Sequence, residues 1–362
     1  MEFALSDDQK MMQDSVRRTL ERVAPLDLVR KADKEPYAAD VFAALRDLGV
    51  PGVLIPAEFG GLELGLFDAA LIAEMLGRSV TPVPFVGSAV MAPLALMGAG
   101  SSSQKLAWLP KLASGETIAG VAISEHASGA RDGAAVSMKN GKLNGRTNFV
   151  LDFAGADIFI VADHFAGLYL VQANARGLEK IALSSIDRTR TIGELVFGNV
   201  EAEPLTDGNA PATLDRMIDA GRAMLAADTL GAGEMMIEKA VAYAKERKQF
   251  GRIIGSFQAV KHLCAEMAAE LEPCRALVWY ASHGFDVFPE QSRRLTAHAK
   301  AHLSEVGQFV ARTSTEVHGG MGFTDLLGLH YWFKRIGFNR QVLGGPERAR
   351  NDAAIAQGWI AN

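Results

Sequence analysis

The sequence contains very little cysteine, no excess of basic residues and no long apolar run. Its two cysteines, Cys264 and Cys274, lie in one helical pattern. A helix rises about 1.5 Å per residue, so we expect these cysteines to be roughly 15 Å apart, which is beyond the reach of a disulfide. We therefore predict two reduced thiols rather than a structural crosslink.

The charge balance argues against a nucleic-acid-binding protein. There are 37 Lys and Arg against 42 Asp and Glu, which gives a formal net charge of −5, whereas a nucleic-acid surface is basic. No apolar run approaches the ~20 residues of a membrane span, and the first residues carry acid where a signal peptide carries base. We predict a cytoplasmic protein that binds neither nucleic acid nor a membrane, in which local basic groups can still meet an anionic ligand.

The length and the pattern of hydrophobic residues indicate three segments. A chain of 362 residues is too long for one ordinary core and is expected to divide into two or three. We predict an α+β multidomain protein with an N-terminal helical domain over residues 1–116, a middle β domain over 117–205 and a C-terminal helical domain over 206–362.

Short-range signals support each segment. Ser6 and Gln9 have the spacing of a capping box at the start of a helix. Asn140-Gly141 is a strong hairpin signal among several short β-rich runs, so we expect an antiparallel β-barrel or sandwich in the middle. Long apolar-striped runs from Leu214 onward predict a four-helix bundle. Gly231 and Gly233 lower helix stability within the first of these runs, which we expect a close helix crossing to offset.

The ends of these long helices carry residues suited to holding a dinucleotide. Arg247 and Phe250 follow one run, Gln258 opens the next, and Gly319 and Gly320 follow a third. A guanidinium forks onto phosphate oxygens, and glycine lets the main chain approach them closely. These residues therefore form our candidate site for a diphosphate and an adenine.

The order of segments and several motifs resemble the acyl-CoA dehydrogenase family over nearly the whole chain. The matching runs are 56–61 (PAEFGG), 109–116 (LPKLASGE) and 246–251 (ERKQFG). The resemblance implies FAD as cofactor, an acyl-CoA thioester as substrate and oxidation across Cα–Cβ, as part of fatty acid or steroid side-chain degradation. It also implies an electron-transferring flavoprotein as electron acceptor and an oligomer, either homomeric or with a second family member.

The resemblance also assigns FAD contacts. In this family the cofactor spans two subunits, and the part held across the interface corresponds here to Arg247, Phe250, Gln258, Gly319 and Gly320. The part held within one subunit corresponds to a loop at Ser124 and a strand at Phe149. This second part departs from the family pattern, because Ala130 and Leu151 stand where hydroxyl residues usually bond FAD.

The catalytic base of the family is absent from both of its usual positions. Most members carry a glutamate near the C-terminus, where this sequence has Gly344. A minority carry it on the first long C-terminal helix just before an arginine, and here Gly221 precedes Arg222. We expect Arg222, Gly221 and Gly344 to line the substrate pocket, which the two glycines would enlarge.

Three interpretations of this loss remain open. In the first, the chain resembles short bacterial subunits of heteromeric acyl-CoA dehydrogenases and a partner supplies the glutamate. In the second, another carboxylate is the base, with Glu347 a better candidate than Asp219. In the third, the chain is a binding or structural subunit without turnover.

One further pattern has the spacing of metal ligands. His298, His302 and Glu305 are separated by four and three residues on a predicted helix. Nothing else in the sequence repeats this pattern, so we interpret the three residues as helical surface and predict no metal site.

Overall fold

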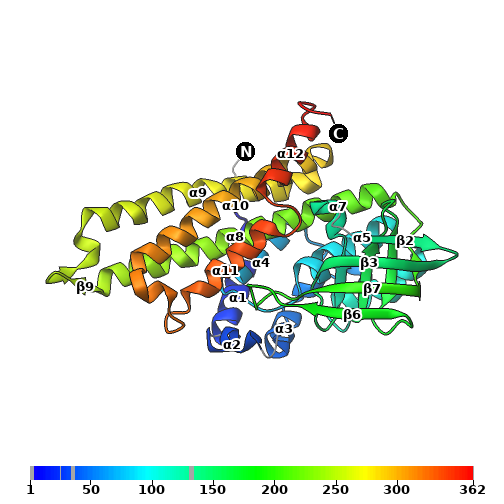
Figure 1. The fold of residues 1–362 in the computed structure, drawn as a ribbon, viewed down its shortest axis with the longest axis horizontal. Coiled ribbons are helices and arrows are strands. Elements are labelled where there is room, and N and C mark those ends of the chain that lie inside the picture. Colours follow the sequence, from blue (N-terminus) through cyan, green and yellow to red (C-terminus); the bar gives the residue numbers. More distant parts are fainter. Residues whose placement is uncertain (1–3, 25, 34–36, 130–133, 362) are drawn as a thin grey trace.

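The computed structural model describes residues 4–24, 26–33, 37–129 and 134–361. Helices begin the chain, a β-sheet follows, and long helices complete it (Figure 1). Ala130 lies outside the described residues. In the part of the chain that the structure describes, no helix is both long enough and apolar enough to cross a lipid bilayer.

Six α-helices form the N-terminal part. The capping box is confirmed at the first, where the Ser6 hydroxyl accepts a hydrogen bond from the backbone N–H of Gln9 and the Gln9 side chain accepts one from the backbone N–H of Ser6. The helices are α1 (Asp7–Val23), α2 (Leu26–Arg30), α3 (Ala39–Arg46), α4 (Leu66–Arg78), α5 (Ala92–Ala99) and α6 (Ser102–Ala113), and a short π-helix, η4 (Val86–Met91), precedes α5.

The middle part is a single open sheet of mixed direction. Its strands run in the order β6-β7-β3-β1-β4-β5-β8, and β2 pairs with the first half of β3, on the edge that β1 contacts at Leu151. The strands are β1 (Ala119–Ala122), β2 (Ala135–Lys139), β3 (Lys142–Leu151), β4 (Ile158–Ala162), β5 (Leu168–Gln172), β6 (Leu178–Leu183), β7 (Ile192–Glu201) and β8 (Glu203–Pro204), and a short helix, α7 (Ser124–Ser128), follows β1.

The prediction of an antiparallel barrel or sandwich is therefore wrong on two points, the closure of the sheet and the direction of its strands. Within the described residues the sheet does not close on itself, and β1 pairs with β4 in parallel. A parallel pair needs a long crossover between its strands, and here residues 123–157 supply it. The predicted hairpin turn is confirmed, since β2 and β3 are antiparallel neighbours and Asn140 and Gly141 both have positive φ.

The two faces of the sheet belong to two different hydrophobic cores. Along β4, Ile158 and Ile160 join the large core shared with the helices, whereas Phe159 and Val161 join a smaller core on the opposite face. Alternate strand residues point to opposite faces. The large core is continuous from the N-terminal helices to the C-terminal ones, and the division at residues 116 and 205 stays a prediction.

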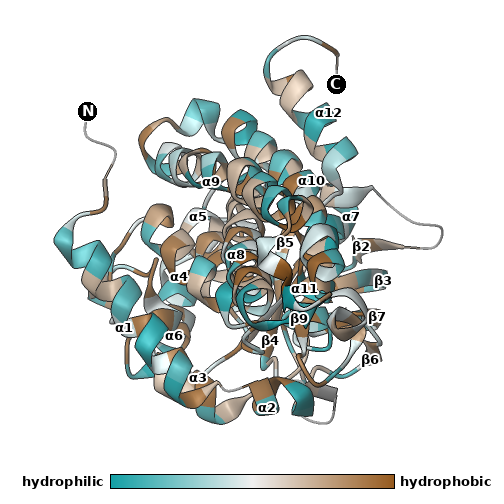
Figure 2. Ribbon diagram, turned by 90° about the vertical axis from the view of Figure 1, so that its left-hand side faces the viewer, coloured by the Kyte–Doolittle hydropathy of each residue, from teal (hydrophilic) through white to brown (hydrophobic). Residues whose placement is uncertain are grey.

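The C-terminal part consists of long helices packed around α8. Viewed along the helices, α8 lies among α4, α9, α10 and α11, all of which contact it (Figure 2). Cys264 and Cys274, both on α9, are free. The helices are α8 (Ala210–Glu246), α9 (Gln258–Val287), α10 (Ser292–His318), α11 (Leu329–Gln341) and α12 (Pro346–Ala356); a hairpin of β9 (Lys248–Gln249) and β10 (Arg252–Ile253) joins α8 to α9, and a 3₁₀ turn, η7 (Gly319–Phe323), follows α10.

The close helix crossing predicted at Gly231 is confirmed. A Cβ atom on Gly231 would lie 1.8 Å from the backbone oxygen of Glu74 on α4, and one on Gly77 would lie 1.9 Å from the backbone oxygen of Asp228. Because neither glycine has a side chain, the backbone of the opposite helix can lie in the space that a side chain would fill. Gly233 instead faces Leu271 of α9.

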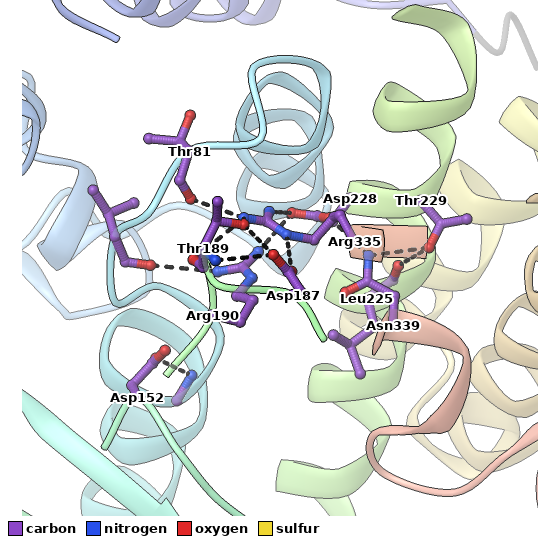
Figure 3. A network of polar contacts seen from close by, with 12 residues as sticks. Thr81, Asp152, Asp187, Thr189, Arg190, Leu225, Asp228, Thr229, Arg335 and Asn339 are labelled. Atoms are coloured by element: carbon purple, nitrogen blue, oxygen red, sulfur yellow. Dashed lines mark hydrogen bonds and ion pairs between the residues drawn. The ribbon is translucent and has the colours of Figure 1, made fainter. Parts of the chain in front are cut away.

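A buried polar network centred on Asp228 joins the three parts of the chain (Figure 3). Asp228 Oδ2 lies 2.6 Å from Arg190 Nη2 and 2.9 Å from Arg335 Nη1, and its Oδ1 accepts a hydrogen bond from Asn339. Arg335 also pairs with Asp187 at 2.7 Å and donates to the backbone oxygen of Thr81. The network connects α8 and α11 to the loop before β7 and to the segment after α4.

Removing the charge at the centre of this network should destabilise the whole chain. In Asp228→Asn, two buried guanidinium groups lose their shared carboxylate, and losing one partner of a buried pair costs about 3–5 kcal/mol. We expect the free energy of unfolding in urea to fall by this amount. The exposed pair of Asp14 with Arg17 is the control, because Asp14→Asn should leave the free energy of unfolding nearly unchanged. An equal effect of both substitutions would contradict the role given to Asp228.

Candidate functional site

The predicted site residues fall into two groups near opposite ends of α8 (Figure 1). The hairpin end consists of Arg247, Phe250, Gln258, Gly319 and Gly320. The central site consists of Ser124, Phe149, Gly221, Arg222 and Gly344. Along α8, residues 221 and 247 are separated by 26 residues, or about 39 Å at 1.5 Å per residue. We therefore describe the two groups as separate sites of the chain.

The turn between β9 and β10 displays Phe250 at the hairpin end. Phe250 and Gly251 both have positive φ, as a tight two-residue hairpin requires. The Phe250 side chain is 92% exposed and contacts Phe257 edge to face. Arg247 is the exposed residue at which α8 ends, and Gln258 is the exposed first residue of α9.

The two glycines of the hairpin end leave their backbone uncovered. Gly319 ends α10 with φ of 57°, and a Cβ on either Gly319 or Gly320 would meet no atom within 4 Å. Together with the exposed guanidinium of Arg247, this open backbone fits an anionic group such as a diphosphate. These groups match only the diphosphate part of a dinucleotide.

Large apolar side chains are exposed around the same end. The β9–β10 hairpin and the connection from α10 to α11 both lie there in Figure 1. An exposed apolar group of this size is typical of a surface that contacts another protein. The exposed residues are Phe250, Ile253, Phe323, Leu326 and Phe333.

The central site contains a pocket of about 330 Å³ between the sheet and the connection from α11 to α12. Ser124 and Phe149 line it, but the Ser124 hydroxyl donates to the backbone oxygen of Phe149 at 2.8 Å. Phe149 has φ of 53° beside an irregularity in β3. The lining consists of Ser124, Glu125, Ser128, Gly129, Asn148, Phe149, Gln341, Val342, Leu343 and Gly345.

Glu125 is a pocket residue whose role the sequence analysis missed. Its carboxylate accepts hydrogen bonds from the Thr147 hydroxyl and from the backbone N–H of Asn148, both at 2.7 Å. Both oxygens are therefore used to fix β3 next to α7. Sequence carries no signal for this contact, because the partners are more than 20 residues away.

Arg222 is fully buried and connects four segments at the central site. Its Nε donates to the backbone oxygen of Leu343 at 2.9 Å, and its Nη2 lies 2.7 Å from the carboxylate of Asp352 on α12 and 3.4 Å from the backbone oxygen of Ala127. Burial lowers the pKa of Arg222, and Asp352 opposes that change. Its Nη1 has no hydrogen-bond partner among the described residues.

The space expected at the two glycines is filled. A Cβ on Gly221 would lie 2.4 Å from Cδ1 of Leu343 and 2.9 Å from the sulfur of Met91. A Cβ on Gly344 would lie 2.9 Å from the backbone oxygen of Ala127, and Gly344 has φ of 93°. The expectation that these glycines enlarge the pocket is therefore wrong in this structure, because neighbouring side chains and backbone take up the room.

Glu347, the candidate base, lies on the surface in the first turn of α12. Its side chain is 75% exposed and pairs with Arg340 at 3.6 Å. It does not belong to the lining of the 330 Å³ pocket. Its role as a base stays a prediction.

Asp219 lines a second cavity of about 540 Å³ between the start of α8, the start of α10 and α12. It is almost fully buried and pairs with Arg293 at 2.7 Å. Burial raises the pKa of Asp219 to about 6, although Arg293 and Arg222 favour its charged form. Asp352 also lines this cavity, so the Arg222–Asp352 pair lies between the two cavities.

The remaining candidates have structural contacts. Among the described residues, no group of three or more His, Cys, Asp or Glu side chains has the arrangement of a metal site. Glu305 pairs with Arg340 and Arg350, and His298 lies 3.5 Å from Gln357. A further cavity of about 850 Å³ along β5 and β7 contains none of the predicted site residues.

Comparisons with known proteins agree on one family. The family model for the acyl-CoA dehydrogenase N-terminal domain matches residues 6–116, and that for the C-terminal domain matches residues 212–357. The chain is 28% identical to the acyl-CoA dehydrogenase IpdE2 of Mycolicibacterium smegmatis, covering 94% of this chain and 96% of that protein. It is 29% identical to IpdE2 of Mycobacterium tuberculosis, covering 94% of each.

Solved structures share the fold over nearly the full length. A variant of the Tcur3481-Tcur3483 steroid ACAD is 27% identical, with a TM-score of 0.88 and 98% of each chain covered. The ChsE4-ChsE5 complex from Mycobacterium tuberculosis is 24% identical, with a TM-score of 0.90 and 100% of each chain covered.

Adding a methyl group at Gly221 should destabilise the protein. Overpacking against Leu343 and Met91 costs about 1–3 kcal/mol, which exceeds the roughly 1 kcal/mol that alanine gains over glycine in a helix. Gly337→Ala is the matched control, because Gly337 lies within α11 with no atom near its would-be Cβ. We expect urea unfolding to show Gly221→Ala less stable than wild type and Gly337→Ala more stable. A stabilised Gly221→Ala would contradict the filled space.

The raised pKa of Asp219 should appear as a pH dependence of stability. The pKa of Asp219 is about 6 in the folded chain, against its usual value of 3.8, so the folded chain holds this proton up to a higher pH than the unfolded chain does. Stability therefore falls as pH rises from about 4 to 6, by about 3 kcal/mol at 1.36 kcal/mol per unit. Asp219→Asn cannot titrate, so its unfolding free energy relative to wild type should increase across this range.

The control for this measurement is Asp215→Asn. Asp215 also pairs with Arg293, but its side chain is 67% exposed. Asp215→Asn keeps the Asp219 carboxyl and removes one negative charge that raises its pKa, so its difference from wild type should rise across pH 4 to pH 6 by less than that of Asp219→Asn. A flat difference for Asp219→Asn, or one of opposite sign, would show that Asp219 does not hold a proton in the folded chain.

Proposed function

Because the chain belongs to the acyl-CoA dehydrogenase family, we propose that it is one subunit of an FAD-dependent enzyme that oxidises an acyl-CoA thioester across Cα–Cβ. A second family member supplies the catalytic base. The observation that carries the proposal is the pair of glycines, Gly221 and Gly344, at the two positions where the family places glutamate.

FAD is held between two subunits in this proposal. The hairpin end provides the exposed guanidinium of Arg247, the amide of Gln258 and the open backbone of Gly319 and Gly320, while Phe250 covers the adenine side. The flavin ring belongs to the central site of the other subunit, since Gly221 and Arg247 of one chain are about 39 Å apart along α8. When bound, FAD would supply the hydride acceptor for the β-hydrogen, and an electron-transferring flavoprotein would take the electrons.

Among the described residues, the three candidate carboxylates are poorly arranged to remove the α-proton. Glu125 lines the central pocket, but both of its oxygens accept hydrogen bonds. Glu347 is exposed and paired with Arg340, and Asp219 faces the other cavity. A positioned base contributes about 10²–10⁴-fold to such a reaction, so a partner subunit is the simplest source of it.

The relatives support a two-component enzyme. The Tcur3481-Tcur3483 steroid ACAD carries two protein names, and the exposed apolar residues of the hairpin end suit a stable protein partner. We propose that the partner is a second family member from the same organism. The acyl group is of fatty or steroid side-chain type.

A non-catalytic subunit with the same fold is the alternative function. The packing of Leu343 and Met91 over Gly221 favours it, because that packing leaves no room beside the helix for a reacting acyl group. In this alternative the chain stabilises the assembly and the partner performs all of the chemistry.

Co-expression with a family member that carries the missing glutamate tests the proposal. We expect the two chains to purify together with bound flavin and to oxidise acyl-CoA, and the chain alone to be at least 10²-fold slower. Flavin absorbance and dye-coupled turnover measure the two properties. A chain that binds flavin and turns over alone at the rate of the complex would exclude the need for a partner.

Three variants of this chain locate the roles within the complex. Arg247→Ala should weaken FAD binding about 10–100-fold, because a hydrogen bond to a charged group contributes about 1.5–3 kcal/mol. Arg252→Ala, on the same hairpin and stacked on Phe257, is its matched control and should retain flavin. Glu347→Gln should retain turnover, and a 10²-fold loss there would make Glu347 the base.

A further inference from the structure

Leu343 occupies the volume beside α8 that a side chain at residue 221 would enter. Its Cδ1 lies 2.4 Å from the would-be Cβ of Gly221, with the sulfur of Met91 on the other side at 2.9 Å. Leu343 is 1% exposed and Met91 is 0% exposed. Leu343 also lines the 330 Å³ pocket, so this residue separates that pocket from the surface of α8.

The backbone that carries Leu343 is held in an unusual conformation. Leu343 and Gly344 both have positive φ, at 57° and 93°, and a leucine rarely adopts this region without support from its surroundings. The support comes from Arg222, whose Nε donates to the Leu343 backbone oxygen at 2.9 Å. Leu343 is therefore fixed by its main chain as well as by its packing.

A buried hydrogen-bond donor and a buried ion pair anchor the segment on its two sides. Before it, the amine of Lys300 on α10 donates to the backbone oxygens of Asn339 and Arg340 at the end of α11. After it, Asp352 of α12 pairs with Arg222 at 2.7 Å. Because both flanking helices are tied to buried polar groups, displacing Leu343 would require breaking one of these contacts.

We propose that Leu343, together with Met91, fills the space beside Gly221, which we call the acyl chamber of this chain. As this plug, Leu343 excludes the acyl group of a CoA thioester from the chamber. This inference rests on the proposed function, which makes an acyl-CoA thioester the substrate class. It goes further in assigning the acyl group to the partner's chamber alone. The plug then explains why both glutamates are missing, because a chamber that excludes the substrate needs no catalytic base.

The plug can be tested by comparing two ligands that differ only in the acyl group. Butyryl-CoA and free CoA are each titrated calorimetrically into the purified full-length chain, alone and in its complex. For each variant, this gives the ratio of the affinity for butyryl-CoA to the affinity for free CoA. Wild-type chain alone should bind the two ligands with a ratio of about one. In Leu343→Ala the ratio should rise at least about tenfold, because each buried methylene contributes about 0.8 kcal/mol.

Matched variants separate loss of the plug from loss of stability. Leu343→Met keeps the volume filled and should keep the ratio near one, as should Val342→Ala, which trims the neighbouring residue of the same pocket. If Leu343→Ala does not fold, Met91→Ala removes the second filler, and its ratio should rise by several fold.

The outcomes distinguish the plug from the proposed function. A wild-type chain that already prefers butyryl-CoA tenfold, unchanged in Leu343→Ala, would overturn the plug while leaving the enzyme assignment intact. Failure of all variants to bind either ligand would also overturn it, and absence of flavin from the complex in the same samples would show that the proposed function had failed as well.

Discussion

The length of α8 is the constraint on which the rest of the structure depends. This helix of 37 residues carries Gly221 and Arg222 near one end, Asp228 near its middle and Arg247 at its C-terminus. A helix of this kind fixes the separation of those residues, because its length is set by the rise per residue. In the proposed function, the chain therefore presents two separate half-sites, and another protein completes each of them.

Buried charge holds the parts of the chain around this helix. Asp228 joins α8 and α11 to the loop before β7 through Arg335 and Arg190, and Arg222 joins α8 to the segment after α11 and to α12. Buried ion pairs are costly to form, but losing one partner leaves an uncompensated charge. Such contacts suit a structure whose segments must keep one relative placement, and they explain why the packing at Leu343 is well defined.

Sequence reasoning succeeded where the signal lies within a few residues. The cap at Ser6 and Gln9 and the turn at Asn140 and Gly141 depend on local geometry, and both are confirmed. The direction of β1 against β4 was missed because strand pairing depends on contacts between distant residues. The packing of Leu343 on Gly221 was missed for the same reason, so that a glycine interpreted as open space proved to be filled. Glu125 of α7 was missed as a pocket residue because its partners lie on β3, more than 20 residues away.

The reciprocal contact of Gly77 and Gly231 has a consequence for exchange of segments between relatives. Each glycine admits the backbone of the opposite helix, so α4 and α8 fit as a pair although they belong to different thirds of the chain. A chimera that takes its N-terminal helical part from one homologue and its C-terminal helical part from another would place a methyl group or larger against a carbonyl unless both parents have glycine there. Chimeras within this family should therefore fold only when α4 and α8 come from the same parent, or when both parents have glycine at the positions of Gly77 and Gly231.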